Sequence, residues 1–321
     1  MQLRKAKPTD QEAIVALLKC SLGETLLPKS VKLWQWKHVD NPFGKSPVLV
    51  AESGGEIVGV RAFMPWRFAR EGQSVKALRA VDTAIHPSFQ GKGIFKKLTL
   101  ELLHECMEDD FQFIFNTPNP QSLPGYLKMG WQKRGRLPLR LAVVRPLEMF
   151  LGKGRSPKQE VALQEWPKDV FNTVSENLAP EGLMTALSDE YLLWRYAQNP
   201  LFRYGWFSDG ESYLCIFRVK AHQRFSEFRI CELLPLGNEM AYNIPEFNKQ
   251  LKKQVGQYGA SLISISGESK VPLQSFGMYR FFKAPKGPMV TLRNLGREQQ
   301  AIERLFDPTG LAFSLGDLEL F

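Results

Sequence analysis

A glycine-rich segment near residue 90 carries the residue types that bind phosphate groups. The stretch His86–Leu98 reads HPSFQGKGIFKKL and joins an expected strand to an expected helix. The first turn of a helix leaves backbone N–H groups without partners, and the positive end of the helix dipole lies there. Glycines let a ligand approach the backbone closely, and lysines add positive charge. The pattern predicts a phosphate-binding turn, although the same residues also suit a plain strand-to-helix connection.

Two well-known phosphate-binding loops do not fit this segment. The loop of P-loop NTPases requires GxxxxGK[ST], which is absent from the sequence. The dinucleotide-binding fingerprint GxGxxG requires a glycine three places after Gly93, where the sequence has Lys96. The segment therefore predicts a phosphate-binding turn of another kind.

The segment AIHPSFQGKGI resembles the coenzyme A motif of the GNAT superfamily of N-acyltransferases. In that motif a strand ending in hydrophobic-x-Pro precedes [Gln/Arg]-x-x-Gly-x-[Gly/Ala] at a helix start, and Gln90 and Gly93 match the first and fourth places. The sixth place is Phe95, where the usual pattern has glycine or alanine. Tandem-domain branches similar to the mycobacterial Eis-type acetyltransferases carry a larger residue there. Phe95 therefore favours such a branch, and its side chain is expected to point into the core.

The resemblance also implies a cofactor, acetyl-CoA, and a way to hold it. Backbone groups of the strand before the loop would pair with the pantetheine arm, and backbone N–H groups of the loop would hold the pyrophosphate. The cofactor-binding residues expected on this basis are Thr83, Ala84, Ile85, Gln90, Gly91, Lys92, Gly93, Ile94, Phe95 and Lys96.

A second GNAT-like signature, NPQSLPGYLKMGW, follows the expected strand FQFIFNT. The family often shows an asparagine, a small residue three places later, a tyrosine at place seven and then Gly-aromatic, as Asn119, Ser122, Tyr126, Gly130 and Trp131 do here. By resemblance, Tyr126 is the general acid for the leaving coenzyme A thiolate, and Asn119 contacts the cofactor. A phenol is protonated at neutral pH and can donate a proton. Without the upstream loop, a tyrosine that only packs would explain the pattern equally well.

The general base is not singled out by the sequence. Asp82 is the first candidate because it lies on the strand expected to bind the cofactor. Glu52 and His86 are the second and third candidates, and each of the three could instead be structural. In some tandem relatives the C-terminal carboxylate acts as the base, which here would be that of Phe321.

The order of expected elements restarts in the second half of the chain. The segment RPLEMFLGKGRSPKQE is rich in glycine, proline and charge, and it predicts a linker. We therefore expect a catalytic GNAT domain at 1–148, a linker at 149–160 and a second domain at 161–321. WKHVDNP in the first half returns as WRYAQNP in the second, just before an expected hairpin in each case. The repeat favours an internal duplication, although an aromatic packing residue followed by an Asn-Pro helix stop would also explain it.

Together with the restart of the pattern, the resemblance implies an α+β fold class, with two tandem GNAT-like domains, each a mixed and mostly antiparallel sheet flanked by helices. The second copy is expected to be degenerate. Its loop equivalent, LLPLGNEMAYNIPEF, lacks the glycine motif, and its LQSFGM has Leu273 where the first copy has Tyr126. An unrelated α+β domain is the alternative for this half.

Composition sets wider limits on the class of protein. The 321-residue chain has a net charge of +9 and a pI near 9.3, which favours anionic partners such as a phosphorylated cofactor. Its four cysteines show no metal-ligand spacing, and free, mostly buried thiols are expected. The N-terminus is polar and no apolar run reaches 18 residues, so we expect no signal peptide, no membrane span and a cytoplasmic location.

The functional prediction is transfer of an acetyl or other acyl group from coenzyme A to a primary amine. The acceptor is expected to be a small molecule or a peptide amine, with no nucleic acid partner. Two alternatives stay open. One is an aminoacyl-tRNA-dependent transferase of the Fem type, which the basic charge would suit but which generally lacks an intact coenzyme A loop. The other is a non-catalytic acyl-CoA-binding protein. The sequence does not indicate the oligomeric state.

Overall fold

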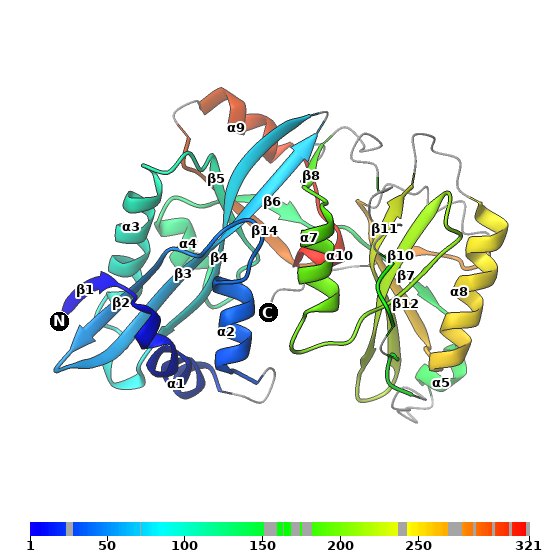
Figure 1. The fold of residues 1–321 in the computed structure, drawn as a ribbon, viewed down its shortest axis with the longest axis horizontal. Helices are drawn as coiled ribbons and strands as arrows, with labels where there is room; N and C mark the ends of the chain where they lie inside the picture. The colour runs from blue at the N-terminus through cyan, green and yellow to red at the C-terminus, as the bar shows by residue number, and fades with distance from the viewer. Residues whose placement is uncertain are drawn as a thin grey trace.

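The computed structural model describes most of the 321-residue chain. The described residues are 1–23, 28–70, 72–150, 159–162, 164–167, 174, 182–236, 243–268, 278–284, 287–296, 299–307 and 310–318. Leu273, Phe321 and the larger part of the predicted linker lie outside them. Figure 1 shows an α+β architecture with two separate sheets, each flanked by helices, as the sequence predicts.

The first sheet has the strand order β1-β2-β3-β4-β5-β14-β6, and β8 and β15 extend it beside β3. All of its neighbouring strands along this order are antiparallel except β4 and β5, which are parallel. The strands are β1 (Gln2–Lys5), β2 (Val48–Ser53), β3 (Glu56–Arg70), β4 (Gln73–Ile85), β5 (Phe113–Asn116), β6 (Gln132–Arg136), β8 (Leu183–Thr185), β14 (Met289–Asn294) and β15 (Leu311–Ala312).

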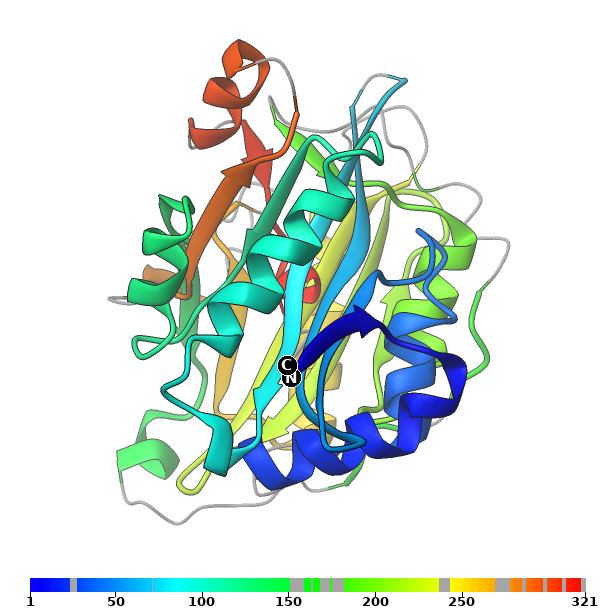
Figure 2. The ribbon, with the colours of Figure 1, turned by 90° about the vertical axis from the view of Figure 1, so that its left-hand side faces the viewer.

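Helices cover both faces of the first sheet (Figure 2). The helices α1 (Gln11–Leu22) and α2 (Val31–His38) lie on one face, where apolar residues of α1 pack on Val60 and Ala62 of β3. The helix α3 (Ile94–Cys106) lies on the other face, with α4 (Leu123–Lys128) beside it. The apolar residues of α3 recur every three or four places, so one side of the helix is buried.

The second sheet has the order β13-β7-β12-β11-β10-β9. Its strands are β7 (Leu139–Val143), β9 (Gly205–Ser208), β10 (Tyr213–Ala221), β11 (Ser226–Pro235), β12 (Leu262–Ser266) and β13 (Phe282–Lys283). The helix α8 (Ile244–Tyr258) packs on it, and α5 (Pro146–Phe150) follows β7. As in the first sheet, a long antiparallel hairpin leads through a helix to a parallel strand.

The two hairpins also share a β-bulge. Partner residues on β3 and β4 skip Asp82, and those on β10 and β11 skip Cys231. A bulge leaves one residue unpaired, bends the strand and re-aims its side chain. The repeat of both element order and bulge is the structural counterpart of the sequence repeat described above.

The sheets exchange one strand each. After β6 the chain leaves the first sheet, and β7 pairs with β12 of the second sheet. In the first sheet, the place between β5 and β6 is taken by β14, which comes from the far end of the chain and pairs with both strands. The strand β14 therefore lies in the predicted second domain by sequence and in the first sheet by hydrogen bonding.

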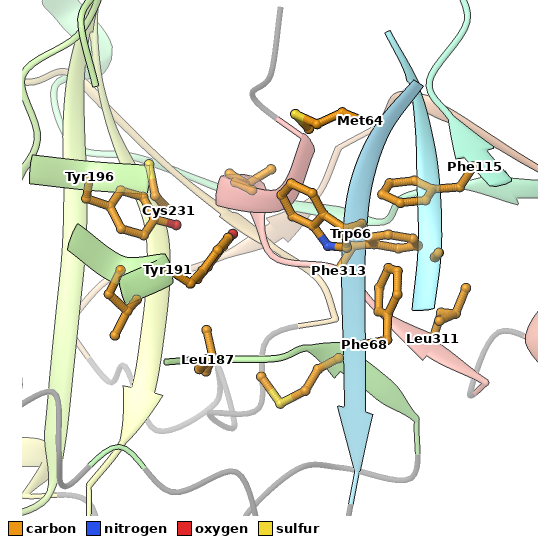
Figure 3. Close-up of a cluster of buried hydrophobic side chains, with 14 of the residues drawn as sticks. Met64, Trp66, Phe68, Phe115, Leu187, Tyr191, Tyr196, Cys231, Leu311 and Phe313 are labelled. Atoms are coloured by element: carbon orange, nitrogen blue, oxygen red, sulfur yellow. The ribbon is translucent and has the colours of Figure 1, made fainter. Parts of the chain in front are cut away.

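The space between the sheets holds the largest apolar cluster of the described residues, part of which Figure 3 shows. It contains the two tryptophans of the sequence repeat. Trp36 donates from its indole nitrogen to the carbonyl of Trp194 at 2.8 Å, and Trp194 donates to the carbonyl of Trp36 at 2.7 Å. Their rings stack with centroids 4.7 Å apart. Trp194 lies in a π-helical turn (η4, Leu193–Ala197) that continues α7 (Asp189–Leu192).

The short helix α10 (Leu315–Leu318) lies between the sheets and is held by two buried arginines. Arg79 of β4 donates to the carbonyls of Asp317 and Leu318, and Arg195 donates to that of Gly316 at 2.7 Å. Cations suit this end of a helix because its carbonyl groups carry partial negative charge. The helix α9 (Gln299–Phe306) precedes this region along the chain.

Candidate active site

The strands β4 and β5 pair only at one end and then part. Their paired residues run from Ala77 with Phe113 to Arg79 with Phe115, and β5 ends at Asn116, whereas β4 continues to Ile85. Within the described residues, no strand pairs with this edge of β4 beyond Arg79. The backbone groups of β4 beyond Arg79 therefore form an open edge to which an extended ligand can add, as a peptide strand would.

The alternation of an antiparallel pair shows which groups face this edge. The N–H of His86 donates to the carbonyl of Val58 on β3 at 2.9 Å. Every second residue of β4 therefore points its N–H and C=O groups toward β3, and Ala84 is one of these residues. The alternate residues, Thr83 and Ile85, point their N–H and C=O groups toward the open edge. The carbonyl of Ile85 accepts from Ser21 and from the side chain of Gln90, both at 3.1 Å.

The glycine turn follows directly at the end of β4. Gly91 has a φ of 76° and Gly93, which begins α3, has a φ of 73°. An added Cβ would meet nothing within 4 Å at either position, so the backbone conformation, not lack of space, is what requires glycine. In the described part of the chain, no acceptor is found for the backbone N–H groups from Gly91 to Lys96. These groups and the exposed lysines of the segment give the turn the chemistry that binding an anion requires.

Phe95 points inward from α3, and Tyr126 meets it from α4. The two rings make an edge contact with centroids 5.7 Å apart, and Tyr126 also contacts Trp131 at 5.1 Å. The side chain of Tyr126 is 5% exposed. Phe95 lies close to Gly125 as well, where an added Cβ would touch the phenyl ring at 3.4 Å.

The hydroxyl of Tyr126 accepts a hydrogen bond from a buried arginine. Arg61 of β3 donates from Nη2 to this hydroxyl at 3.0 Å and from Nη1 to the carbonyl of Val81 at 2.9 Å. One guanidinium thus connects α4 to β4 at the start of its open edge. No acceptor for the proton of the hydroxyl itself occurs among the described residues, so this proton is available to a ligand.

Asp82 lies in the bulge of β4 on the opposite face of the sheet, under α2. Its Oδ2 accepts from Lys37 at 2.7 Å and lies 2.8 Å from Nε2 of His38, whose Nδ1 lies 2.8 Å from the hydroxyl of Ser46. Burial alone would raise the pKa of Asp82, but Lys37 and His38 hold this pKa well below its usual range. Burial lowers the pKa of His38 more than Asp82 raises it, which favours neutral His38 at pH 7.

The other predicted residues have local partners. The side-chain oxygen of Asn119 accepts from the N–H of Ser122, the residue before α4, at 2.8 Å. The carboxylate of Glu52 pairs with Arg4 of β1 at 2.7 Å, and Glu52 itself lies on β2, which is separated from β4 by β3. His86 accepts from the N–H of Ser88 at 3.3 Å at the start of the glycine turn.

Sequence reasoning missed three buried polar residues, of which Arg61 contacts Tyr126, and Lys37 and His38 contact Asp82 on the opposite face of the sheet. Arg61, Lys37 and His38 are each at most 3% exposed. Arg61 could have been found, because it is a lone charge within the apolar stretch IVGVRAFMPW. Lys37 and His38 belong to the repeated segment WKHVDNP, but nothing in that segment indicates that both would reach a carboxylate on β4.

Comparison with known proteins agrees with this geometry. Residues 2–134 match the family model of the acetyltransferase (GNAT) domain. A search of curated proteins found no match to the chain. A GCN5-related N-acetyltransferase from Anabaena variabilis is similar in structure, with a TM-score of 0.63, 16% identity, and coverage of 92% of this chain and 73% of the other.

Two further solved structures are similar to nearly the same extent. A probable N-acyltransferase of unknown function from Enterococcus faecalis has a TM-score of 0.62 and 12% identity over 92% of this chain and 72% of its own. Eis1 from Mycobacterium abscessus has a TM-score of 0.58 and 12% identity over 94% of this chain and 76% of its own.

The chain thus has the fold of the GCN5-related N-acetyltransferases. Its N-terminal part, residues 2–134, matches the family model of the GNAT acetyltransferase domain, and this part contains the open edge of β4, the glycine turn and Tyr126.

Proposed function

We propose that the protein is an N-acetyltransferase that moves an acetyl group from acetyl-CoA to a primary amine by direct attack. The observation that carries the proposal is the open edge of β4, which ends in an anion-binding glycine turn and has the Tyr126 hydroxyl beside it. An extended, phosphate-bearing thioester matches these three features in one continuous path.

The residues that would hold the cofactor fall into two groups. The N–H groups of residues 91–96 would bind the pyrophosphate, and Thr83 and Ile85 would pair with the pantetheine arm through backbone groups. Ala84 stays the sequence prediction for this arm, although its backbone groups face β3. Gln90 would contribute indirectly, because its side chain donates to the carbonyl of Ile85 and so fixes the turn. Asn119 would also contribute indirectly, because it accepts from the N–H of Ser122 just before α4. Acetyl-CoA, when bound, supplies the thioester.

The chain would move two protons during the reaction. Tyr126 would donate its proton to the sulfur as the carbon–sulfur bond breaks and the amine nitrogen bonds to the acetyl carbon. The attacking amine must also lose a proton. Asp82 stays the first candidate for this base because it lies on β4, although it faces α2 and not Tyr126, and although Lys37 and His38 weaken it as a proton acceptor. A cytoplasmic location and a degenerate second half also remain predictions of the sequence.

Calorimetric titration of acetyl-CoA tests the cofactor. We expect micromolar binding to the wild type and its loss in Gly93→Glu, because a glutamate there would place negative charge and bulk in the anion-binding turn. Gly93→Ala is the matched control, since it introduces the same backbone strain without the carboxylate. It should bind within a few-fold of the wild type. Absence of binding to the wild type would contradict the proposal and favour the tRNA-dependent alternative.

Tyr126→Phe separates an enzyme from an acyl-CoA-binding protein. With acetyl-CoA and a panel of polyamines, amino sugars and peptide amines, we expect kcat to fall by about 100-fold, the usual contribution of a general acid. The affinity for acetyl-CoA should not change. Tyr258→Phe is the control, because this buried tyrosine packs in the second sheet. A wild type that binds acetyl-CoA but turns over no amine would support the binding protein instead.

A further inference from the structure

Arg61 is a fully buried cation without an anionic partner. Its side chain is 0% exposed, and within the described part of the chain no carboxylate lies at salt-bridge distance from its guanidinium. The Nε atom of the guanidinium has no hydrogen-bond partner at all. Burying an unpaired charge costs several kcal/mol. Because burying Arg61 costs this much free energy, an interaction that compensates for the cost is expected at this position.

The groups that face Arg61 come from four elements and none of them is negative. The carbonyl of Val81 (β4) and the hydroxyl of Tyr126 (α4) accept its two hydrogen bonds. Three aromatic rings surround the guanidinium: Phe63 of β3 at 4.7 Å, Phe95 of α3 at 5.8 Å and Tyr126 itself at 5.5 Å. The faces of such rings attract cations, but only partly replace a counter-ion.

We infer that Arg61 is the positioning residue that aims the Tyr126 hydroxyl at the leaving sulfur and that stabilises the negative charge shared by the sulfur and the phenol oxygen as the proton moves between them. The inference rests on the proposed function. Because the hydroxyl oxygen accepts from Arg61, its proton must point away from Arg61, toward a ligand on the open edge of β4. The missing counter-ion of Arg61 is then the charge that develops during the reaction.

The proton and electron balance of this step is complete. As the carbon–sulfur bond breaks, the electron pair stays on sulfur, and the Tyr126 proton moves to it. The negative charge that would be left on the phenol oxygen receives the Nη2–H hydrogen bond of Arg61. The proton released by the attacking amine restores the phenol through the base or solvent. A charge-assisted hydrogen bond is stronger than a neutral one, so the interaction strengthens as the charge forms.

This arrangement also accounts for the bulky sixth residue of the loop motif. The Phe95 ring closes one side of the pocket around Arg61 and contacts Tyr126 edge-on. A glycine or alanine there would leave the guanidinium open on the side of α3. Phe95, the residue at which the sequence departs from the usual motif, and the buried Arg61 therefore form one structural unit.

The experiment compares coenzyme A, which has a thiol, with desulfo-coenzyme A, which lacks the sulfur. A thiol ordinarily ionises near pH 8.5. If Arg61 and Tyr126 stabilise a thiolate, the wild type should prefer coenzyme A over desulfo-coenzyme A increasingly between pH 7 and pH 9. We expect this preference to rise by about tenfold, the effect of a nearby opposite charge on ionisation. The ratio of the two affinities removes the titration of unrelated protein groups.

Arg61→Met and Tyr126→Phe should each abolish the rise, and the double variant should do no more than either. The two single variants should bind desulfo-coenzyme A with the same affinity as the wild type. A normal rise in Arg61→Met would overturn the inference, as would an equal loss of affinity for both ligands, which would indicate a role in folding only. Arg61→Gln replaces Arg61→Met if the latter does not fold. If neither ligand binds the wild type, the proposed function itself fails, whereas binding of both without a rise refutes only the role of Arg61.

Discussion

At the residue scale, the buried carboxylate of Asp82 is held ionised by its neighbours. Lys37 and His38 both reach the same oxygen, and the three side chains are at most 9% exposed. Loss of one partner of a buried ion pair leaves the other charge uncompensated, which costs more than the pair itself contributes.

We expect Asp82→Asn to lower the free energy of unfolding at pH 7 by about 3–5 kcal/mol, because Lys37 would be buried without its counter-ion. The folded-state pKa of Asp82 lies below the value of about 3.9 that applies to the unfolded chain. The stabilisation is therefore complete above about pH 5 and is lost as the pH falls below about 4. Urea denaturation at a series of pH values measures this.

The control for this prediction is Asp110→Asn. Asp110 is 77% exposed and pairs with Lys76 at 3.7 Å, so its removal should change stability little at any pH. A difference between wild type and Asp82→Asn that stays constant from pH 7 to pH 3 would mean that the carboxylate contributes by packing and not by charge.

Single residues also show where prediction from sequence succeeds and where it stops. The turn with Gly91 and Gly93 was predictable, because its chemistry lies in consecutive residues and in the helix that follows. Arg61 and Tyr126 lie in separate parts of the chain, and only the packing of α4 against β3 brings them together. No local pattern encodes such a contact.

At the element scale, the repeated segments WKHVDNP and WRYAQNP meet each other in space. The two tryptophans exchange hydrogen bonds, and the asparagines form similar turns: Asn41 accepts from the N–H of Phe43 and Asn199 from that of Leu201. The packing tryptophan and Asn-Pro helix stop, given above as the alternative explanation of the repeat, are thus present in both segments, together with a contact between them that the sequence did not indicate.

We expect Trp36→Phe to destabilise the protein by about 1–3 kcal/mol, because the carbonyl of Trp194 would lose its only indole donor in a buried site. Trp36→Phe and Trp194→Phe should be non-additive, since each removes part of the same stacked pair. Chemical unfolding followed by circular dichroism measures both effects.

Trp206→Phe serves as the comparison for the tryptophan pair, because its indole donates to the carbonyl of Glu165 in a more exposed setting. If the two single losses at Trp36 and Trp194 simply add in the double variant, the reciprocal bonds are not a coupled unit.

At the scale of the whole molecule, the exchanged strands join the two halves. Local signals predicted the strand and helix on either side of the glycine turn, the strand FQFIFNT and the hairpin after each repeated segment, which correspond to β4, α3, β5 and the hairpins β2–β3 and β9–β10. The exchange of β7 and β14 was not predictable, because each short strand would pair equally well with several neighbours. The choice is made by the long-range geometry of the two sheets.

We expect the fragment 1–148 to be unfolded or aggregated when produced alone. It lacks β14, so β5 would have an unpaired edge, β6 would lose the strand that it pairs with, and β7 would have no sheet to join. Circular dichroism and size-exclusion chromatography test this, with the full chain as the reference, which should unfold in a single transition. A soluble, monomeric fragment that binds acetyl-CoA would show that the first sheet folds without the exchanged strand.

The position of β14 along the chain also matters while the protein is being made. The strand β6 ends at Arg136, but β14 begins only at Met289, so the ribosome must add the whole stretch between them before the first sheet can close. At ordinary rates of synthesis this takes roughly ten to thirty seconds. During that time the nascent chain presents the open edge of β5 and the unpaired edges of β6 to the cell. Successful production of the protein should therefore depend on how fast this stretch is translated and on what shields those edges meanwhile.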